Sequence, residues 1–220
     1  MVRNALIMAA GKGERMLPIT KYIPKAMALY KDKTLIERSI SILKGYGFNV
    51  HVTIGHKGNM LCQHILQKGI SSIIDTNGQG NCWWIYNSLL KHINEPVVVS
   101  TCDIILDIDF NKILLEYNEL NRPSCLIVPV KVKSGVDGDC VVCENKKVIS
   151  IGRHIASDIY CSGVQIINPF KINLKTTQSD NFSDLWNQLI KNGDIFCSEN
   201  YPRTWSSIDT VEQLQCLNDE

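Results

Sequence analysis

The sequence predicts an α/β protein whose mixed, mainly parallel sheet is covered by helices on both faces. In the first hundred residues, short apolar runs alternate with segments whose apolar residues recur at helical spacing. The first apolar run leads into a glycine-rich loop, and after residue 103 strand-like runs joined by polar turns dominate. Alternating strands and helices form parallel sheets that are buried on both faces, which is the basis of this prediction.

The first half contains the alternating elements. Strands are predicted at residues 6–9, 50–54, 70–74 and 97–100, each a short and largely apolar run. Helices are predicted at residues 34–44, 59–67 and 83–92. Gly45 and Gly47 follow the first of these helices as stop signals. Connections between the parallel strands are expected to be right-handed.

The second half reads as a mixed sheet appended to the first. A helix at 110–117 is followed by strand-like runs at 124–132, 140–143, 148–151 and 160–167. A helix at 183–191, a short strand at 195–198 and a helix at 211–217 complete it. The sequence shows no linker rich in proline and serine and no internal repeat. We therefore expect one domain, residues 1–220, with sub-regions 1–103 and 104–220.

Composition restricts the classes of partner. The 220 residues carry a net charge of +1 and are 45% apolar, which gives no argument for nucleic acid or an anionic membrane surface. An anion site must therefore be local. Residues 11–25 provide one, because Lys12, Arg15, Lys21 and Lys25 stand there against the single carboxylate of Glu14.

The nine cysteines indicate a reducing compartment. They are scattered and odd in number, and we see no secretion signal and no apolar run of about 20 residues. We therefore expect reduced thiols in the cytoplasm. Cys140 and Cys143 have the spacing of a metal-binding pair, but positions three apart on a strand point to opposite faces. Two packing cysteines are the favoured interpretation.

The glycine-rich loop is the segment with the clearest chemistry. Gly11 and Gly13 follow the first strand, so the main chain can approach a ligand closely. A Walker loop is absent because no Gly-Lys-Ser/Thr follows at the required spacing, and the dinucleotide fingerprint is incomplete because position 16 is Met. Two glycines alone could be a plain turn. The residues added around them favour a polyphosphate site, namely Arg15, Pro18, Thr20, Pro24 and Lys25.

This segment, AAGKGERMLPITKYIPKAM, resembles the signature of the sugar-1-phosphate nucleotidylyltransferases, or NDP-sugar pyrophosphorylases. Three later segments also resemble that family, namely Thr101-Cys102-Asp103, Tyr160-Cys161-Ser162-Gly163-Val164 and residues 205–214. The resemblance spans nearly the whole chain and is weak between 104 and 158. It implies a Rossmann-like (GT-A-type) fold, with 1–103 binding the nucleotide and 104–220 the acceptor.

The resemblance also implies roles for the loop. Arg15 would hold the β- and γ-phosphates, and Lys25 would reach the α-phosphate and stabilise charge developing there. Surface cations without a chemical role are the alternative. Backbone groups would hold the nucleoside triphosphate at Ala9, Ala10, Gly11, Lys12 and Gly13.

Two carboxylates are candidate Mg²⁺ ligands. Asp103 follows the strand at 97–100, and ligands of open α/β sheets bind at the carboxyl ends of strands. A turn or helix N-cap is the alternative for Asp103. Many members of the family carry Trp-x-Asp-x-Gly-Thr near the C-terminus, where this chain has Ser207. Asp209 stands two residues later and resembles the Ile-Asp-Thr form of cytidylyltransferases. It could also cap the following helix.

Acceptor and base recognition are assigned to further residues by the same resemblance. Arg153 would bind the acceptor phosphate, with His154 as second choice, and Gly163 lies in the acceptor-side strand. Gln79 or Asn81 would bond the edge of the base. Exposed loop cations and an ordinary polar turn are the alternatives.

The resemblance implies transfer of a nucleoside monophosphate from a nucleoside triphosphate to a sugar 1-phosphate. The reaction would depend on Mg²⁺ and release pyrophosphate, and it belongs to nucleotide-sugar biosynthesis. One alternative is a CTP-dependent cytidylyltransferase that acts on a phosphocholine-like or phosphonate acceptor. Another is a catalytically silent, nucleotide-binding regulatory subunit, which the departures at Cys102 and Ser207 motivate. The base, the acceptor and the oligomeric state stay open.

Overall fold

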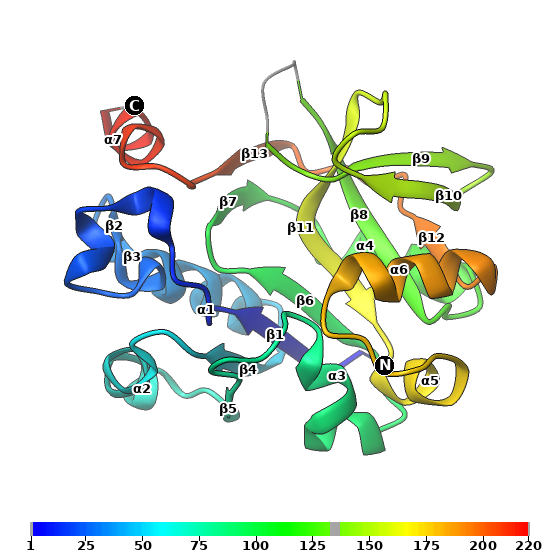
Figure 1. Cartoon of the computed structure of the whole chain (residues 1–220), viewed down its shortest axis with the longest axis horizontal. Helices are drawn as coiled ribbons and strands as arrows, with labels where there is room; N and C mark the ends of the chain where they lie inside the picture. The colour runs from blue at the N-terminus through cyan, green and yellow to red at the C-terminus, as the bar shows by residue number, and fades with distance from the viewer. Residues whose placement is uncertain (1, 133–136, 220) are drawn as a thin grey trace. The chain divides into compact units, whose positions relative to one another are not determined.

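The computed structural model describes residues 2–132 and 137–219 (Figure 1). It comprises two compact units. The amino-terminal unit consists of Arg3–Gln79, Ser100–Ile105 and Ser206–Glu220. The central unit consists of Met1–Val2, Gly80–Val99 and Leu106–Trp205. The expectation of one domain with sub-regions 1–103 and 104–220 stays a prediction.

A parallel three-stranded arrangement lies at the centre of the amino-terminal unit. Its strand order is β5 (Ser72–Asp75), β4 (Asn49–Ile54) and β1 (Asn4–Met8). All neighbouring pairs are parallel, with Ala5 opposite Val50 in the register of β1 and β4. Residues 4–7 of β1 are buried. A parallel strand covered on both faces is a continuous apolar run, which is why β1 could be predicted.

Helices α1 (Leu35–Gly45), α2 (Gly58–Ile65) and α7 (Val211–Asp219) belong to the same unit. A 3₁₀ turn, η4 (Leu66–Lys68), continues α2, and a hairpin of β2 (Leu29–Tyr30) and β3 (Lys33–Thr34) precedes α1. Helix α1 begins with a capping box: Thr34 Oγ1 accepts the Glu37 N–H, and Glu37 Oε2 accepts the Thr34 N–H. The buried face of α1 is made by Leu35, Ile36, Ile40 and Leu43.

The loop after β1 contains three single 3₁₀ turns. These are η1 (Glu14–Met16), η2 (Ile19–Lys21) and η3 (Lys25–Met27). Met16 is fully buried in a cluster that also contains Leu35, Ile208 and Leu214. The loop is therefore attached to the same core as α1 and α7, although much of its polar face is exposed.

The central unit contains a mixed sheet. Its order is β11 (Ile159–Ile167), β8 (Cys125–Lys131), β12 (Ile195–Cys197), β10 (Lys147–Gly152) and β9 (Cys140–Glu144). Only β8 and β12 are parallel among these neighbours. The helices of this unit are α3 (Trp83–Asn87), α4 (Phe110–Glu119), α5 (Pro169–Lys175) and α6 (Phe182–Lys191).

Three strands belong partly to each unit, because a unit boundary falls within them. They are β6 (Val97–Thr101), β7 (Ile104–Asp107) and β13 (Thr204–Ser207). Strand β6 was predicted, whereas β7 was not. The four residues of β7 follow a turn directly, so they are too few to show a period in the sequence.

The helix predicted at 83–92 is interrupted. Helix α3 ends at Asn87, Ser88 is extended (φ −100°, ψ 168°), and a 3₁₀ turn, η5 (Leu89–His92), follows. The Ser88 hydroxyl accepts the Leu90 N–H and so caps the second piece. Helix α5 was not predicted, although an asparagine followed by a proline is a common helix start. In the structure, the Asn168 side chain accepts the Lys171 N–H and caps this helix.

The nine cysteines are free thiols. Cys140 is buried and Cys143 is half-buried on β9. Within residues 2–132 and 137–219, no three His, Cys, Asp or Glu side chains are grouped so that they could hold a metal ion. In the same part of the chain, no helix has both the length and the apolar character needed to cross a membrane.

Candidate active site

Hydrogen bonds fix the start of the glycine-rich loop to β4 and to the residues that follow β4. The Ala9 N–H donates to Thr53 Oγ1 of β4 at 3.1 Å, and the Ala10 carbonyl accepts the His56 N–H at 3.1 Å. Gly55 permits this approach, because a Cβ at that position would lie 2.7 Å from the Ala10 carbonyl oxygen. Residues 9 and 10 are therefore positioned by hydrogen bonds to Thr53 and His56, and the exposed Gly11 and Lys12 follow them.

Gly13 is required where the loop turns toward Lys25. Its φ is +63°, in the left-handed region, and a Cβ there would lie 2.9 Å from Lys25 Cβ and 3.1 Å from Thr20 Cγ2. The Gly13 carbonyl accepts both the Thr20 hydroxyl and the Met16 N–H, each at 2.9 Å. The absence of a side chain at this position thus lets Lys25 pack directly on the loop.

Lys25 lies between two carboxylates. Its Nζ donates to Asp103 Oδ2 at 2.6 Å and to Asp209 Oδ1 at 3.0 Å. The Lys25 side chain is 12% exposed. Burial by itself lowers the pKa of its ammonium, but attraction and hydrogen bonds from Asp103 and Asp209 outweigh this, so the pKa is raised above its ordinary value. Lys25 is therefore a charged group held by opposite charges.

Arg15 approaches the same cluster from the loop. Its Nη2 donates to Asp209 Oδ1 at 3.0 Å, and its side chain is 54% exposed. The residues next to Arg15 and Asp209 in the sequence explain why these two side chains meet. Met16 and Ile208 are both fully buried in one core cluster, so the residue beside each is held near the same surface. Two cations and two carboxylates are thus gathered in the amino-terminal unit.

Asp209 is presented by a short, well-bonded turn. The Ile208 N–H donates to the Asp103 carbonyl at 2.8 Å, which ties the two acidic segments together. Strand β13 ends at Ser207, so Asp209 lies beyond the strand. The cap contact at the start of α7 comes from Thr210, whose Oγ1 accepts the Gln213 N–H at 3.2 Å. The Asp209 carboxylate therefore contacts the cations, while its own N–H donates to Gln213 Oε1.

The two carboxylates are suited to a divalent cation. Mg²⁺ is commonly held by one or two carboxylates together with phosphate oxygens and water. Asp103 and Asp209 share a cation already, since the Lys25 ammonium contacts both. The two carboxylates are therefore close enough to bind the same cation. Asp103 and Asp209 would hold the metal, and the remaining ligands would come from phosphate and water.

The remaining predicted residues make other contacts. Lys12 is exposed and lies 3.7 Å from Glu14. Asn81, in the central unit, accepts the Phe182 N–H with its Oδ1 at 3.0 Å and so holds the start of α6. The Gln79 N–H donates to the Thr76 carbonyl in a turn.

On the acceptor side, Arg153 forms an exposed pair with Asp137 at 3.0 Å. Gly163 has a φ of +88° at an irregularity of β11, where the register shifts between Cys161 and Val164. Both residues belong to the central unit. The roles assigned to them stay predictions.

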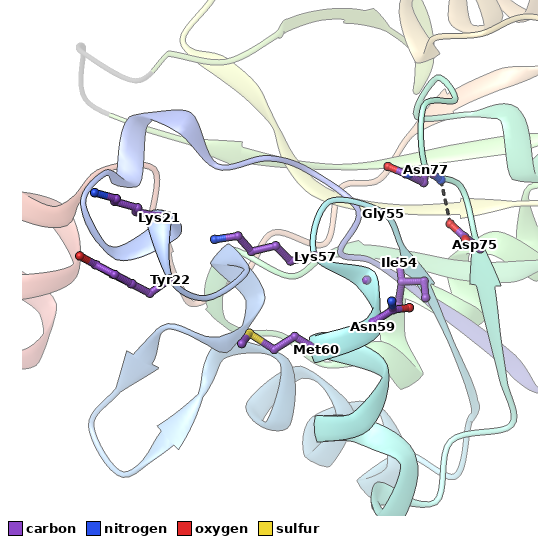
Figure 2. A pocket seen from close by; sticks show the side chains of 10 residues that line it. Lys21, Tyr22, Ile54, Gly55, Lys57, Asn59, Met60, Asp75 and Asn77 are labelled. Atoms are coloured by element: carbon purple, nitrogen blue, oxygen red, sulfur yellow. Dashed lines mark hydrogen bonds between the residues drawn. The ribbon is translucent and has the colours of Figure 1, made fainter.

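A cavity of 580 Å³ lies at the carboxyl ends of β4 and β5 (Figure 2). Lys21 and Tyr22 reach it from the loop after β1, and Asp75 comes from the end of β5. Lys57 also lines it and donates from Nζ to the Thr20 carbonyl at 2.7 Å. The sequence analysis did not select Lys57 and Asp75. Asp75 directly follows the strand predicted at 70–74, and Lys57 comes three residues after the strand predicted at 50–54, at the strand ends where ligands of α/β sheets bind.

The fold and the site together define a class of protein. The amino-terminal unit of this α/β protein combines a glycine-rich loop after the first strand with two cations and two carboxylates. The sequence profile of the MobA-like NTP transferase domain matches residues 5–148. The chain belongs to this family.

Two curated relatives are similar in sequence. A CTP:phosphoglutamine cytidylyltransferase from Campylobacter jejuni is 35% identical over 111 residues, which cover 46% of this chain and 44% of the relative. A UTP–glucose-1-phosphate uridylyltransferase from Synechocystis is 25% identical over 235 residues, covering 94% of this chain and 60% of the relative. The chain thus matches about half the length of these relatives.

A solved structure confirms the fold. UDP-glucose pyrophosphorylase in complex with UDP-glucose superimposes with a TM-score of 0.78 at 18% identity, covering 100% of this chain and 98% of that one. The predicted α/β class with a mixed sheet flanked by helices is therefore confirmed. The family resemblance that the sequence predicted is confirmed as well.

Proposed function

We propose that this chain is a nucleotidyltransferase that moves a nucleoside monophosphate from a nucleoside triphosphate to a phosphorylated acceptor, with a sugar 1-phosphate as the leading acceptor. The observation that carries the proposal is the Lys25 ammonium held between Asp103 and Asp209 beside the glycine-rich loop. Membership of the NTP transferase family supports the reaction type.

The residues divide the work by charge. Backbone groups of residues 9–13 bind the triphosphate, and Arg15 holds the β- and γ-phosphates. Lys25 would reach the α-phosphate and stabilise the charge that develops on it. Mg²⁺, held by Asp103 and Asp209, would neutralise phosphate charge when bound. In the protein without ligands these four side chains neutralise one another.

The bond changes balance without a protein base. An ionised oxygen of the acceptor phosphate forms a bond to the α-phosphorus. The bond from that phosphorus to the bridging oxygen breaks, and its electron pair leaves with pyrophosphate. Because a phosphate monoester is already ionised, no side chain has to remove a proton. Positioning and charge neutralisation carry the rate.

A second candidate is a CTP-dependent cytidylyltransferase with a non-sugar acceptor. The similarity to the CTP:phosphoglutamine enzyme favours it, because that relative has the higher identity of the two compared. Asp209 supports it too, since Ile208-Asp209-Thr210 resembles the form found in cytidylyltransferases. In this reading the reaction steps stay the same, and only the base and the acceptor change.

A pyrophosphate-release screen tests both candidates. ATP, CTP, GTP, UTP and dTTP are each paired with sugar 1-phosphates and with phosphocholine, inositol 1-phosphate and a phosphoamide, in the presence of Mg²⁺. Turnover with a sugar 1-phosphate supports the first candidate, and turnover restricted to CTP and a non-sugar acceptor supports the second. The matched negative control is Asp103→Asn. No turnover with any pair would contradict the enzymatic proposal and favour a silent nucleotide-binding subunit.

A further inference from the structure

We propose that Lys25 is a built-in occupant of the divalent-cation position, so that a divalent cation and a triphosphate bind this protein well only together. The inference rests on the proposed function, because it describes the ligand-free state of the same site. It concerns three side chains of the amino-terminal unit, namely Lys25, Asp103 and Asp209. It assigns to Lys25 a role in controlling metal binding in addition to its role toward phosphate.

The Lys25 ammonium acts as the counter-ion of both carboxylates. Lys25 Nζ lies 2.6 Å from Asp103 Oδ2 and 3.0 Å from Asp209 Oδ1, so a single ammonium bonds both carboxylates. The three side chains are only 12%, 26% and 19% exposed, respectively. Charge-assisted hydrogen bonds in such a half-buried place are stronger than those at an open surface. A divalent cation that arrives alone must therefore displace Lys25.

Charge balance adds to this barrier. Arg15 also bonds Asp209, so two positive groups stand against two negative ones. The carboxylates then present almost no net negative charge to an incoming cation. Arg15 is the weaker obstacle, because its side chain is 54% exposed and its bond to Asp209 is therefore screened by water. Lys25 is the principal obstacle, since it contacts both and is nearly covered.

A triphosphate removes the barrier by offering these cations other partners. Its oxygens at the glycine-rich loop attract Lys25 and Arg15, and the carboxylates are then available to the metal. Lys25 lies against the loop already, because Gly13 has no side chain between them. Each ligand raises the affinity for the other, as linkage requires.

The first test measures Mn²⁺ alone, by calorimetry and by electron paramagnetic resonance, with no nucleotide present. We expect Lys25→Met to bind Mn²⁺ at least about tenfold more tightly than the unmodified chain, because the competing charge-assisted donor is gone. Lys57→Met is the matched control. It removes the same charge in the same unit, but Lys57 donates to the Thr20 carbonyl. We expect its Mn²⁺ affinity to change less than about threefold.

The gain must come from the two carboxylates. The double variant Lys25→Met/Asp103→Asn should therefore lose it. An unchanged or weakened Mn²⁺ affinity in a folded Lys25→Met protein would overturn the inference. Lys25→Gln provides a second readout if the methionine variant fails to fold, since it keeps a hydrogen-bonding group without the charge.

The reciprocal test uses inorganic tripolyphosphate in the presence of a chelator, so that no metal takes part. Asp103→Asn should bind tripolyphosphate at least about fivefold more tightly, because Lys25 loses a competing carboxylate. The matched control is Asp32→Asn, which removes an exposed carboxylate from the same unit. Equal gains in both variants would show a general charge effect and refute the inference.

These measurements separate the inference from the proposed function, because none of them needs turnover. Tighter Mn²⁺ binding by Lys25→Met with a negative pyrophosphate screen would contradict the enzymatic proposal and support the inference. Turnover by the unmodified protein with no gain in Mn²⁺ binding would support the enzyme and contradict the inference.

Discussion

Replacing Gly13 by alanine tests whether the conformation of the glycine-rich loop sets the position of Lys25. The residue has a φ of +63°, and alanine in that region costs about 1–2 kcal/mol. The added Cβ would also stand 2.9 Å from Lys25 Cβ, whereas carbon atoms pack best at about 3.5–4.0 Å. Relieving this crowding typically costs a further 1–3 kcal/mol, roughly.

The free energy of unfolding should therefore fall by about 2–5 kcal/mol in Gly13→Ala. The turnover rate should fall by more than the decrease in stability alone would cause. Relief of the contact moves Lys25 by a substantial fraction of an ångström, and a misplacement of about 1 Å can reduce a rate by about a hundredfold. Chemical unfolding and pyrophosphate release, with the substrate pair found in the screen, measure the two effects.

Two other glycines separate the cost of the left-handed backbone from the cost of crowding around the added Cβ. Gly47 has a φ of +80° with open space around its added Cβ, so Gly47→Ala carries the backbone cost alone, about 1–2 kcal/mol. Gly45, the last residue of α1, also has open space and no positive φ, so Gly45→Ala should be neutral or stabilising by about 0.5–1 kcal/mol. The reasoning is refuted if Gly13→Ala is no less stable than Gly47→Ala and turns over normally.

Three further predictions follow from single contacts. Lys25→Ala and Asp103→Ala should each lower turnover at least about a hundredfold, since each removes an electrostatic stabiliser, and normal pyrophosphate release by Asp103→Ala would contradict its role. Ile208→Ala should lower the free energy of unfolding by about 2–5 kcal/mol, measured by denaturant titration, because the side chain is fully buried. Hydrogen bonds from the Lys68 ammonium and the Thr34 N–H lower the pKa of Glu37 from 4.5 to about 2. The ionised Glu37 therefore contributes its full stabilisation of the folded state above pH 4.5, and this contribution is lost as pH falls toward 2. Unfolding of Glu37→Gln and the parent should thus differ at neutral pH and converge near pH 2, and a constant difference would refute this.

Local patterns predicted most of the elements because they depend on neighbouring residues. Strand β1 is a buried apolar run, and α1 was predicted from apolar residues at helical spacing, which form its buried face. The break at Ser88 was missed because the apolar spacing continues across it. Only the extended backbone and the hydroxyl cap show that the helix ends there.

The site was predictable in its parts and not in its contacts. Arg15 and Lys25 stand in a motif, and Asp103 follows a strand, so each could be selected as a candidate. Asp209 was a weaker choice between metal ligand and helix cap. The structure gives the cap contact to Thr210, which leaves the Asp209 carboxylate bonded to the cations. No pattern within a few residues contains that information.

The sequence by itself determined the alternation of strands and helices in the first hundred residues, the glycine-rich loop and the set of charged residues that accompanies it. Only the tertiary structure decided that Lys25 bonds Asp103, 78 residues away, and Asp209, 184 residues away. The physical reason is that an ion pair forms between whichever charges the core holds at one surface. Here the buried Met16 and Ile208 share one apolar cluster, and burial of that cluster brings the distant acidic segment to the loop.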